Sequence, residues 1–341
     1  MKVLAVSNAF PTPSLEAQGI YAWREVLGLR SLGVEVEDYR STFRRDFRGS
    51  WVEVRRRIEA SRPDLVNVYA GSIGAFAVSL ACPVPLVMTF GGPDLLGPAA
   101  QDSFSERGVG VMAVAFSQAA IPSADAIVVR SAQLRRRLLR ARDRERAHVI
   151  AAGVDVEVFR PLDKAAARRE VGWDPAARVI LFGASRRRAI KRFDRAADAV
   201  ARLAARGVAA RIESCEQVPP ARMPLLLSAA DCLLLTSQHE GSPNIVKEAA
   251  ACGCPVVSVP VGDVAEVLEG VRPGRIVEPD GELLATALEE VLAAGRRSNG
   301  PGRIKARYAL PITAGRVRQV YEETLDAWRA GRRHGWRRLH R

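Results

Sequence analysis

The stretch HEGSPNIVKEAAACGCPVV, residues 239–257, combines a small polar turn with the start of a helix. Ser242 is a preferred N-cap residue, and Pro243 suits the first helical position because its missing N–H would be unpaired there anyway. The next three backbone N–H groups would point out of the helix end; they belong to Asn244, Ile245 and Val246. Such an end attracts a phosphate or hydroxyl oxygen, so the stretch predicts a helix that begins at a ligand.

Two acidic residues frame this helix start. Glu240 lies in the turn before it, and Glu248 lies nearly two turns into the helix, with Lys247 expected on a different face. The simplest interpretation is that both acids complement the helix dipole or pair with basic side chains. That interpretation suits Glu240 but fits Glu248 less well, because Glu248 lies beyond the first turn, where the dipole acts. The pair therefore indicates carboxylates that accept hydrogen bonds from a ligand.

Short β-rich segments alternate with amphipathic segments along most of the chain, which is typical of parallel sheets with crossover helices. The first half has such segments at residues 2–7, 34–38, 64–70, 85–90, 126–130 and 148–152. The pattern restarts at residues 178–183, 208–214, 231–236, 255–259 and 274–279. The sequence therefore predicts an α/β fold with two Rossmann-like parallel-sheet domains facing a cleft, where the carboxyl ends of the strands bind ligands.

The length of 341 residues also favours two domains, because a domain usually holds about 100–200 residues. A connection rich in Asp and Pro begins at residue 152 and separates the two alternating patterns. We therefore predict a first domain at residues 1–155, a second at residues 156–308, and a C-terminal helix with a basic tail at residues 309–341.

The formal net charge is +13, and only five of the 51 basic residues are lysines. This excess indicates an anionic partner, although compositional bias explains the larger part of it. Nucleic acid is the less favoured partner, because no recognised binding motif accompanies the charge. An arginine-rich helix expected at residues 135–146, and the tail with Trp328 and Trp336, would suit an anionic membrane surface. A solvated terminus is an equally good interpretation of the tail.

Other composition features narrow the class of protein. The five cysteines lack the C-x-x-C spacing of zinc and redox sites, so reduced core thiols in a cytoplasmic chain are expected. The four histidines form no cluster by spacing, and no metal site is predicted. No stretch approaches the roughly 18 apolar residues of a membrane-spanning helix, so any membrane contact is expected to be peripheral.

The frame S-x-x-E-G-x-P-x-x-x-x-E-A-x-A-C-G-x-P-V-V, residues 237–257, resembles the signature of the retaining glycosyltransferases of family four (group 1), which have the GT-B fold. Four other segments are similar to parts of that family: AGVDVEVFRP at 152–161, LFGASRRRAIKRFDRAADAV at 181–200, TFGGPDLLG at 89–97, and VYEETL at 320–325. The resemblance implies that the C-terminal helix returns to the first domain.

The resemblance also implies roles for the second domain. Glu248 would hold the ribose of a nucleotide diphosphate sugar, with UDP- or GDP-sugars expected, and Glu240 would contact the donor sugar as a catalytic residue. Lys191 matches the family lysine that binds the donor phosphate, and Arg187 is the candidate for the family arginine; a solvated basic loop is the alternative for any single arginine here. Cationic side chains and the helix end would neutralise the diphosphate, so no metal and no further cofactor are expected.

In the first domain, Gln18 and Gly19 match half of the family's Gly-Gly pair, which would approach the diphosphate or the acceptor; a glycine at a helix start is the alternative. Gly91 stands where the family has a histidine near the donor sugar. Gly92 is assigned, together with Gln18 and Gly19, to the acceptor and diphosphate loop. Asp94 is a candidate catalytic residue, although a helix-capping role is at least as good an interpretation.

The sequence thus predicts a retaining, metal-independent hexosyltransferase that moves a sugar to a glycan or lipid-linked acceptor in envelope or exopolysaccharide biosynthesis. It would be cytoplasmic, or peripheral on the inner face of the cell membrane. Two alternatives stay open: a GT-B-fold sugar-nucleotide epimerase or hydrolase, and an inactive glycosyltransferase-like scaffold, which the loss of the histidine at Gly91 favours.

Overall fold

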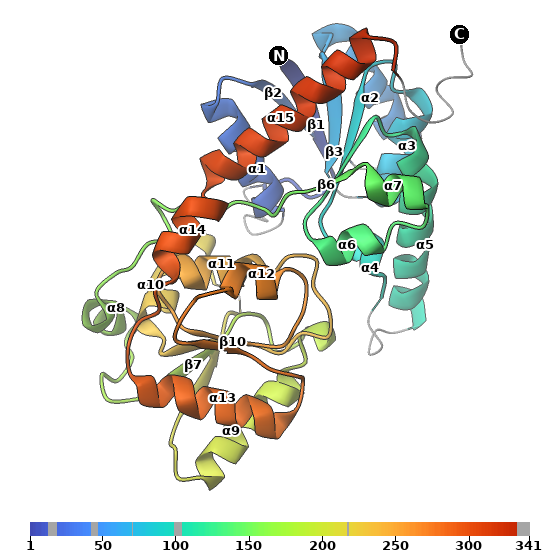
Figure 1. Cartoon of the computed structure of the whole chain (residues 1–341). Coiled ribbons are helices and arrows are strands. Elements are labelled where there is room, and N and C mark those ends of the chain that lie inside the picture. Colours follow the sequence, from blue (N-terminus) through green and yellow to red (C-terminus); the bar gives the residue numbers. More distant parts are fainter. Residues whose placement is uncertain (13–18, 42–46, 70, 99–103, 217, 333–341) are drawn as a thin grey trace. The chain divides into compact units, whose positions relative to one another are not determined.

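The computed structural model describes the chain except for residues 13–18, 42–46, 70, 99–103, 217 and 333–341. The chain divides into two compact units (Figure 1). Of the described residues, unit 1 comprises those within 1–98, 104–153 and 310–332, and unit 2 comprises those within 154–309. Each unit is built on its own parallel sheet, which confirms the two Rossmann-like folds that the alternating pattern predicts.

The sheet of unit 1 has the strand order β2-β1-β3-β4-β5-β6, with every pairing parallel. Its strands are β1 (Lys2–Ser7), β2 (Glu35–Arg40), β3 (Leu65–Tyr69), β4 (Leu86–Phe90), β5 (Ala126–Val129) and β6 (Ala147–Val149). Successive side chains of a strand point to opposite faces, and the central strands are apolar at both sets of positions because helices cover both faces.

Helices α1 (Ile20–Ser31) and α15 (Leu310–Arg329) cover one face of this sheet. They run side by side (Figure 1), and Gly28 permits their close approach, because a Cβ there would lie 3.0 Å from Ala314 Cβ. Helix α15 therefore completes the core of unit 1, as the family resemblance implies. The remaining helices of unit 1 are α2 (Phe47–Ser61), α3 (Ser72–Ala81), α4 (Pro93–Leu96), α5 (Phe104–Ala120), η1 (Ile121–Ser123), α6 (Ala132–Arg136) and α7 (Ala141–Glu145).

A buried polar chain links α15 to the sheet. Asn67 Nδ2 donates to the Tyr321 hydroxyl at 2.6 Å, and Thr89 Oγ1 donates to Asn67 Oδ1 at 3.0 Å. Beside it, Arg130 donates to the buried Glu25 at 2.6 Å. Burial raises the pKa of the Tyr321 hydroxyl well above its ordinary value, so that group stays protonated and available for hydrogen bonding.

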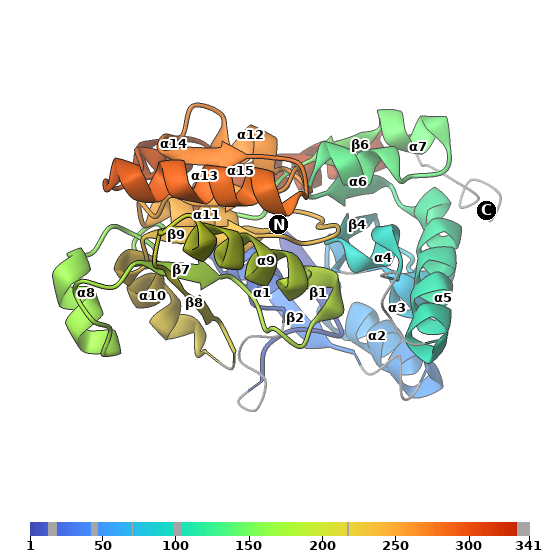
Figure 2. The ribbon, with the colours of Figure 1, turned by 90° about the horizontal axis from the view of Figure 1, so that it is seen from below.

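The sheet of unit 2 has the order β11-β10-β9-β7-β8 and is also parallel. Its strands are β7 (Val179–Phe182), β8 (Arg211–Ser214), β9 (Cys232–Leu235), β10 (Val256–Ser258) and β11 (Gly274–Ile276). Its helices are α8 (Lys164–Val171), η2 (Ala189–Lys191), α9 (Phe193–Ala205), η3 (Pro220–Arg222), α10 (Met223–Ala229), α11 (Asn244–Ala251), α12 (Val264–Leu268), α13 (Gly281–Ala294) and α14 (Gly300–Tyr308). Helices α9 and α13 pack against each other on one side of the sheet (Figure 2).

The single helix expected at residues 135–146 is wrong. The chain forms the two short helices α6 and α7, because Leu138 turns into the core between them and Arg144 donates to the carbonyl oxygens of Leu138 and Leu139. Among the described residues, no helix is both long and apolar enough to cross a membrane.

Candidate functional site

Three loops of unit 2 meet where neighbouring parallel strands end. They follow β7, β9 and β10, and β9 lies between the other two strands. The first two loops are tied together, because Thr236 Oγ1 donates to the carbonyl oxygens of Lys191 and Arg192, at 3.0 and 2.9 Å. The backbone N–H of Gln238 also donates to the Ile190 carbonyl, at 2.9 Å. The sheet thus brings together polar residues that are about 50 positions apart in the sequence.

Lys191 and Glu240 form an ion pair within this cluster. Lys191 Nζ contacts Glu240 Oε1, and Ser237 Oγ donates to the same oxygen at 2.7 Å. The two charged side chains are only about one-sixth exposed, so water screens their attraction less than at an open surface. The two residues assigned from the sequence to phosphate and to sugar therefore share one polar site.

A second polar cluster lies under the start of α11. Lys247 has no exposed surface, and its Nζ donates to Ser242 Oγ at 2.5 Å and lies 3.5 Å from Asp263 Oδ2. Ser242 Oγ in turn donates to Asp263 Oδ2 at 2.7 Å. These contacts join the turn before α11, the helix itself and the loop after β10 into one unit.

The N-cap role predicted for Ser242 is wrong. Helix α11 begins at Asn244, Pro243 is its N-cap, and no side chain caps it. The Ser242 hydroxyl instead forms hydrogen bonds with Lys247 and Asp263. The lysine lies along the buried side of the helix and reaches back to the preceding turn. Two buried acceptors at this point, Asn244 Oδ1 and Asp263 Oδ1, have no hydrogen-bond partner among the described residues. Hydroxyl or N–H groups of a ligand would satisfy such acceptors.

Two glycines allow the backbone of these loops to pack closely. A Cβ at Gly183, directly after β7, would lie 2.9 Å from the Ile245 side chain on the first turn of α11. Gly262 has a φ of +61°, and a Cβ there would lie 3.0 Å from Pro243 and 3.1 Å from the Gly241 carbonyl oxygen. Larger residues would force the three loops apart.

Glu248 is 3% exposed and lies on the second turn of α11. Burial, and to a smaller extent the Glu248 charge, raise the pKa of the Cys215 thiol to about 12. Helix α11 begins in the loop that follows β9, so Glu248 lies about one turn from the carboxyl edge of the sheet. The free N–H predicted at Val246 is wrong: Val246 is buried, and its N–H donates to the Pro243 carbonyl oxygen at 3.1 Å, within the first turn of α11.

The arginines after β7 have different surroundings. Arg186 stacks over the Phe193 ring at 4.8 Å and donates to Ser214 Oγ at 3.1 Å, so its side chain lies towards β8. Arg187 is exposed, and its backbone N–H donates to Ser185 Oγ at 3.2 Å. Arg192, which was not among the predicted site residues, forms an ion pair with Asp194 at 2.6 Å. Its left-handed backbone before α9 could not have been read from the pattern.

In unit 1, Asp94 holds two loops together. Its carboxylate accepts N–H groups from Gly71 and Gly92, each at 2.8 Å, and from Gly91 at 3.4 Å. Burial raises the pKa of Asp94, while these hydrogen bonds oppose the rise. Gly92 has a φ of 154°, which only glycine adopts readily, and it precedes α4. The geometry gives Asp94 a loop-organising contact, and its catalytic role stays a prediction.

Gly19 and Gly91 contrast sharply. Gly19 is left-handed at the start of α1, and a Cβ there would lie 1.8 Å from the Ala9 carbonyl oxygen, so glycine is required. Among the described residues beyond its chain neighbours, none has an atom within 4 Å of a Cβ on Gly91, which leaves room for a side chain. Gln18 lies outside the described residues. Within the part of the chain that the structure describes, no cluster of three His, Cys, Asp or Glu side chains could hold a metal.

Comparison with known proteins gives matches over both halves of the chain. Residues 9–158 match the family model described as Glycosyltransferase Family 4, and residues 156–294 match the model described as Glycosyl transferases group 1. D-inositol 3-phosphate glycosyltransferase from Thermobispora bispora is 30% identical over 225 residues, which cover 53% of this chain and 51% of that relative. The chain thus spans about half the length of this curated relative.

Solved structures share the fold over nearly the whole chain. Sucrose-phosphate synthase from Thermosynechococcus elongatus superposes with a TM-score of 0.76 at 18% identity, covering 96% of this chain and 100% of that one. HepE from Anabaena, solved in complex with UDP-glucose, gives a TM-score of 0.67 at 18% identity, covering 95% and 100%. At such identities the likeness establishes the fold alone.

Proposed function

The chain belongs to the family four, group 1 glycosyltransferases with the GT-B fold, and on that premise we propose that it transfers a sugar from a nucleotide diphosphate donor, with retention of anomeric configuration. The observation that carries the proposal is the cluster of Lys191, Ser237 and Glu240 beside the start of α11. It puts a cation, a carboxylate and a helix end at the carboxyl edge of one parallel sheet, where such sheets bind nucleotides. A solved GT-B neighbour contains UDP-glucose, which supports a nucleotide sugar as the donor.

In this proposal the diphosphate is held by Lys191, by Arg187 and by the start of α11. Phosphate oxygens compete with Glu240 for the Lys191 ammonium, because both form charge-assisted hydrogen bonds with it. Once Lys191 turns to the phosphate, Glu240 keeps its contact with Ser237 and faces the donor sugar. Its negative charge then stabilises the positive charge that develops on the anomeric carbon.

Glu248 is proposed to accept hydrogen bonds from the ribose hydroxyls. Its place on the second turn of α11 supports this role, because ribose adjoins the diphosphate in the donor and the start of α11 is proposed to hold that diphosphate. Lys191 and the helix end neutralise the diphosphate without a metal ion. The acceptor is proposed to be a glycan or a lipid-linked glycan, used on the cytoplasmic side of the cell membrane in envelope or exopolysaccharide synthesis.

The first experiment is a thermal-shift screen with UDP, GDP, ADP and their common sugar conjugates. We expect one nucleotide to raise the melting temperature of the chain and Glu248→Ala to abolish the shift. Glu240→Ala should keep the shift and lower turnover at least tenfold, since it acts on the developing charge. Turnover should persist in EDTA. No shift with any nucleotide would refute the donor site.

The two alternatives predict different kinetics. A GT-B-fold epimerase or hydrolase would consume the nucleotide sugar without an acceptor. An inactive scaffold would bind the nucleotide sugar and leave it intact under all conditions; the glycine at position 91 favours this second alternative. Following the donor by anion-exchange chromatography, with and without a glycan extract, separates the three functions.

A further inference from the structure

The exposed face of α5 is apolar. Five positions at helical spacing share this face and are all exposed; they are Gly108, Val111, Met112, Ala115 and Ala119. Val109, Val111 and Met112 are each more than half exposed. From residue 108 to the end of the helix no residue is charged, over a length of about 20 Å. A surface helix normally carries polar side chains on its outer face, so this one lacks the usual pattern.

Another exposed apolar residue, outside α5, lies beside this face. Leu139 is 74% exposed, and its N–H donates to Gln118 Oε1 on α5 at 3.2 Å. Gln118 Nε2 donates to the Arg137 carbonyl at 2.9 Å, and Arg144 binds the carbonyl oxygens of Leu138 and Leu139 at 2.6 and 2.9 Å. The turn that presents Leu139 is therefore a fixed structure. We call α5 from residue 108 onwards, together with Leu139, the α5 surface.

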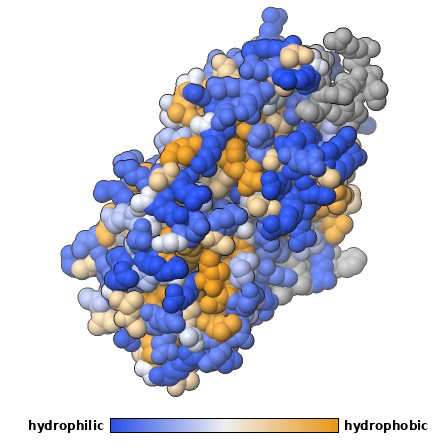
Figure 3. Space-filling model, in the orientation of Figure 1, coloured by the Kyte–Doolittle hydropathy of each residue, from blue (hydrophilic) through white to orange (hydrophobic). Residues whose placement is uncertain are grey.

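Arginines surround Leu139 on α6, α7 and the turn between them. Five of them are exposed: Arg135, Arg136, Arg137, Arg140 and Arg142. Between residues 132 and 146 the acidic residues are Asp143, which is buried and pairs with Arg146, and Glu145. Figure 3 shows an apolar patch over α5 at the right-hand edge of the molecule, next to strongly hydrophilic surface over α6 and α7.

We propose that the α5 surface and its five arginines dock unit 1 onto an anionic lipid bilayer. An apolar strip rimmed on one side by cations matches acyl chains that lie beneath anionic headgroups. A second copy of the chain fits less well, because a symmetric contact would bring the arginine clusters of two copies together. The proposal needs neither the donor site nor a particular acceptor.

Co-sedimentation with vesicles tests this surface directly. The full chain should bind vesicles of phosphatidylglycerol and phosphatidylcholine in equal parts, and should bind phosphatidylcholine vesicles at least tenfold more weakly. Replacing Arg135, Arg136 and Arg140 by Gln should weaken binding to the anionic vesicles about 100-fold. The double substitution V111E/M112E should weaken it at least tenfold, since it places charges where the acyl chains would lie.

Matched controls come from unit 2. The first control replaces the exposed residues Arg169, Arg178 and Arg222 by Gln, which changes the net charge as much as the triple arginine variant of unit 1 does. The second control, Leu283→Glu, places a charge on an apolar residue that is 47% exposed. Both controls should bind vesicles as the unaltered chain does, and so should Glu240→Ala, which separates this proposal from the transfer reaction. Three results would each overturn the membrane-docking proposal. The controls could lose as much vesicle binding as the α5 and arginine variants; those variants could bind as the unaltered chain does; or the unaltered chain could show no preference for anionic vesicles.

Discussion

Lys247 carries a charge in the interior, and its environment makes that charge a sensitive part of the site. Its ammonium lies between Ser242 and Asp263, and neither charged side chain is more than 3% exposed. Lys247→Met would leave Asp263 buried without its cation. We expect the free energy of unfolding to fall by about 3 kcal/mol, measured by urea denaturation.

A double-mutant cycle separates this pairing from simple loss of packing. In the Lys247→Met variant, adding Asp263→Ala should lower the free energy of unfolding by less than Asp263→Ala does in the unaltered chain. The reason is that no buried cation is left behind. Lys305→Met, at an exposed lysine of α14, is the control and should leave stability nearly unchanged. Additive effects of the two buried substitutions would show that the charges do not interact.

The empty space at Gly91 allows the family's histidine to be restored. Apart from the two chain neighbours, no described residue has an atom within 4 Å of a Cβ at this position, so Gly91→His should leave the melting temperature unchanged. If the proposed transfer reaction is correct, an added hydrogen-bond donor near the sugar should raise turnover roughly tenfold. Gly92→His is the control: its φ of 154° is unsuited to a side chain, so that variant should lose stability. Turnover unchanged by Gly91→His would remove the histidine position from the proposed site.

Individual site residues differ in how far the sequence reveals them. Glu240 and Glu248 receive their predicted roles from one motif of fixed spacing, whereas Lys191 receives its role from a separate segment that resembles the family; all three roles stay predictions. The sequence places Lys247 on a different face of α11 from Glu248, but it does not predict the burial of Lys247 against Asp263, which follows another strand. Asp263 was missed because pairing across loops depends on strand order, which local sequence does not contain. Ser237 was missed although its contact with Glu240 is local, because the motif assigned it no role.

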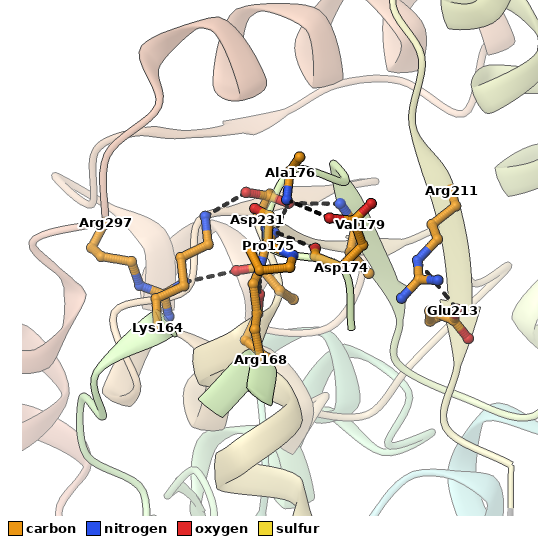
Figure 4. Close-up of polar contacts among 12 residues, drawn as sticks. Lys164, Arg168, Asp174, Pro175, Ala176, Val179, Arg211, Glu213, Asp231 and Arg297 are labelled. Carbon is orange, nitrogen blue, oxygen red and sulfur yellow. Dashed lines mark hydrogen bonds and ion pairs between the residues drawn. The ribbon is translucent and has the colours of Figure 1, made fainter. Parts of the chain in front are cut away.

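At the scale of elements, a network at the amino-terminal edge of the unit 2 sheet joins α8 to two strands (Figure 4). Asp231, directly before β9, accepts from Lys164 at 2.5 Å, from Arg168 at 2.6 Å and from the N–H of Val179 at 2.6 Å. Arg168 is 5% exposed and also donates to the carbonyl oxygens of Pro175 and Ala229. The network lies at the opposite edge from the candidate site, so its function is to fix the elements.

We therefore predict that Asp231→Ala lowers stability and spares nucleotide affinity. It leaves the buried Arg168 guanidinium without its carboxylate, which should cost about 3 kcal/mol in urea denaturation. Arg211 and Glu213, also in Figure 4, form the control pair, because both are about 40% exposed. Glu213→Ala should cost less than 1 kcal/mol. A Kd for nucleotide that rises with Asp231→Ala would instead connect this edge to the site.

Element boundaries show where local rules fail. Serine followed by proline is typical of a helix start, yet α11 begins two residues after Ser242. The Ser242 oxygen accepts a hydrogen bond from the buried Lys247 and does not cap the helix. Similarly, residues 135–146 have the composition of one exposed helix, and the burial of Leu138 breaks it in two. In both cases a tertiary contact outweighs the propensity of the segment.

At the scale of the whole molecule, the two parallel sheets could be predicted because each strand is a short apolar segment between helical ones. The order of the strands, the closure of unit 1 by α15 and the polar chain through Asn67 could not be derived from composition or periodicity, although the family resemblance implied the returning helix. These features depend on contacts between residues far apart in the sequence, such as Asn67 with Tyr321, 254 positions apart, and Arg318 with the Leu32 carbonyl oxygen, 286 positions apart.

Because each unit has its own sheet and core, we predict two separable unfolding transitions in calorimetry. The nucleotide identified by thermal shift, at about 100 times its Kd, should stabilise unit 2 by about 2.7 kcal/mol and raise only that transition, by roughly 5–10 °C. Asp231→Ala identifies the unit 2 transition by lowering it. Tyr321→Phe, which removes the acceptor of the buried Asn67 amide, should lower only the unit 1 transition. A different result would be a nucleotide that raises both transition temperatures equally, or that raises the one lowered by Tyr321→Phe. The donor site could then not belong to unit 2 alone. The roles proposed for Lys191, Glu240 and Glu248 would have to be shared with residues of unit 1.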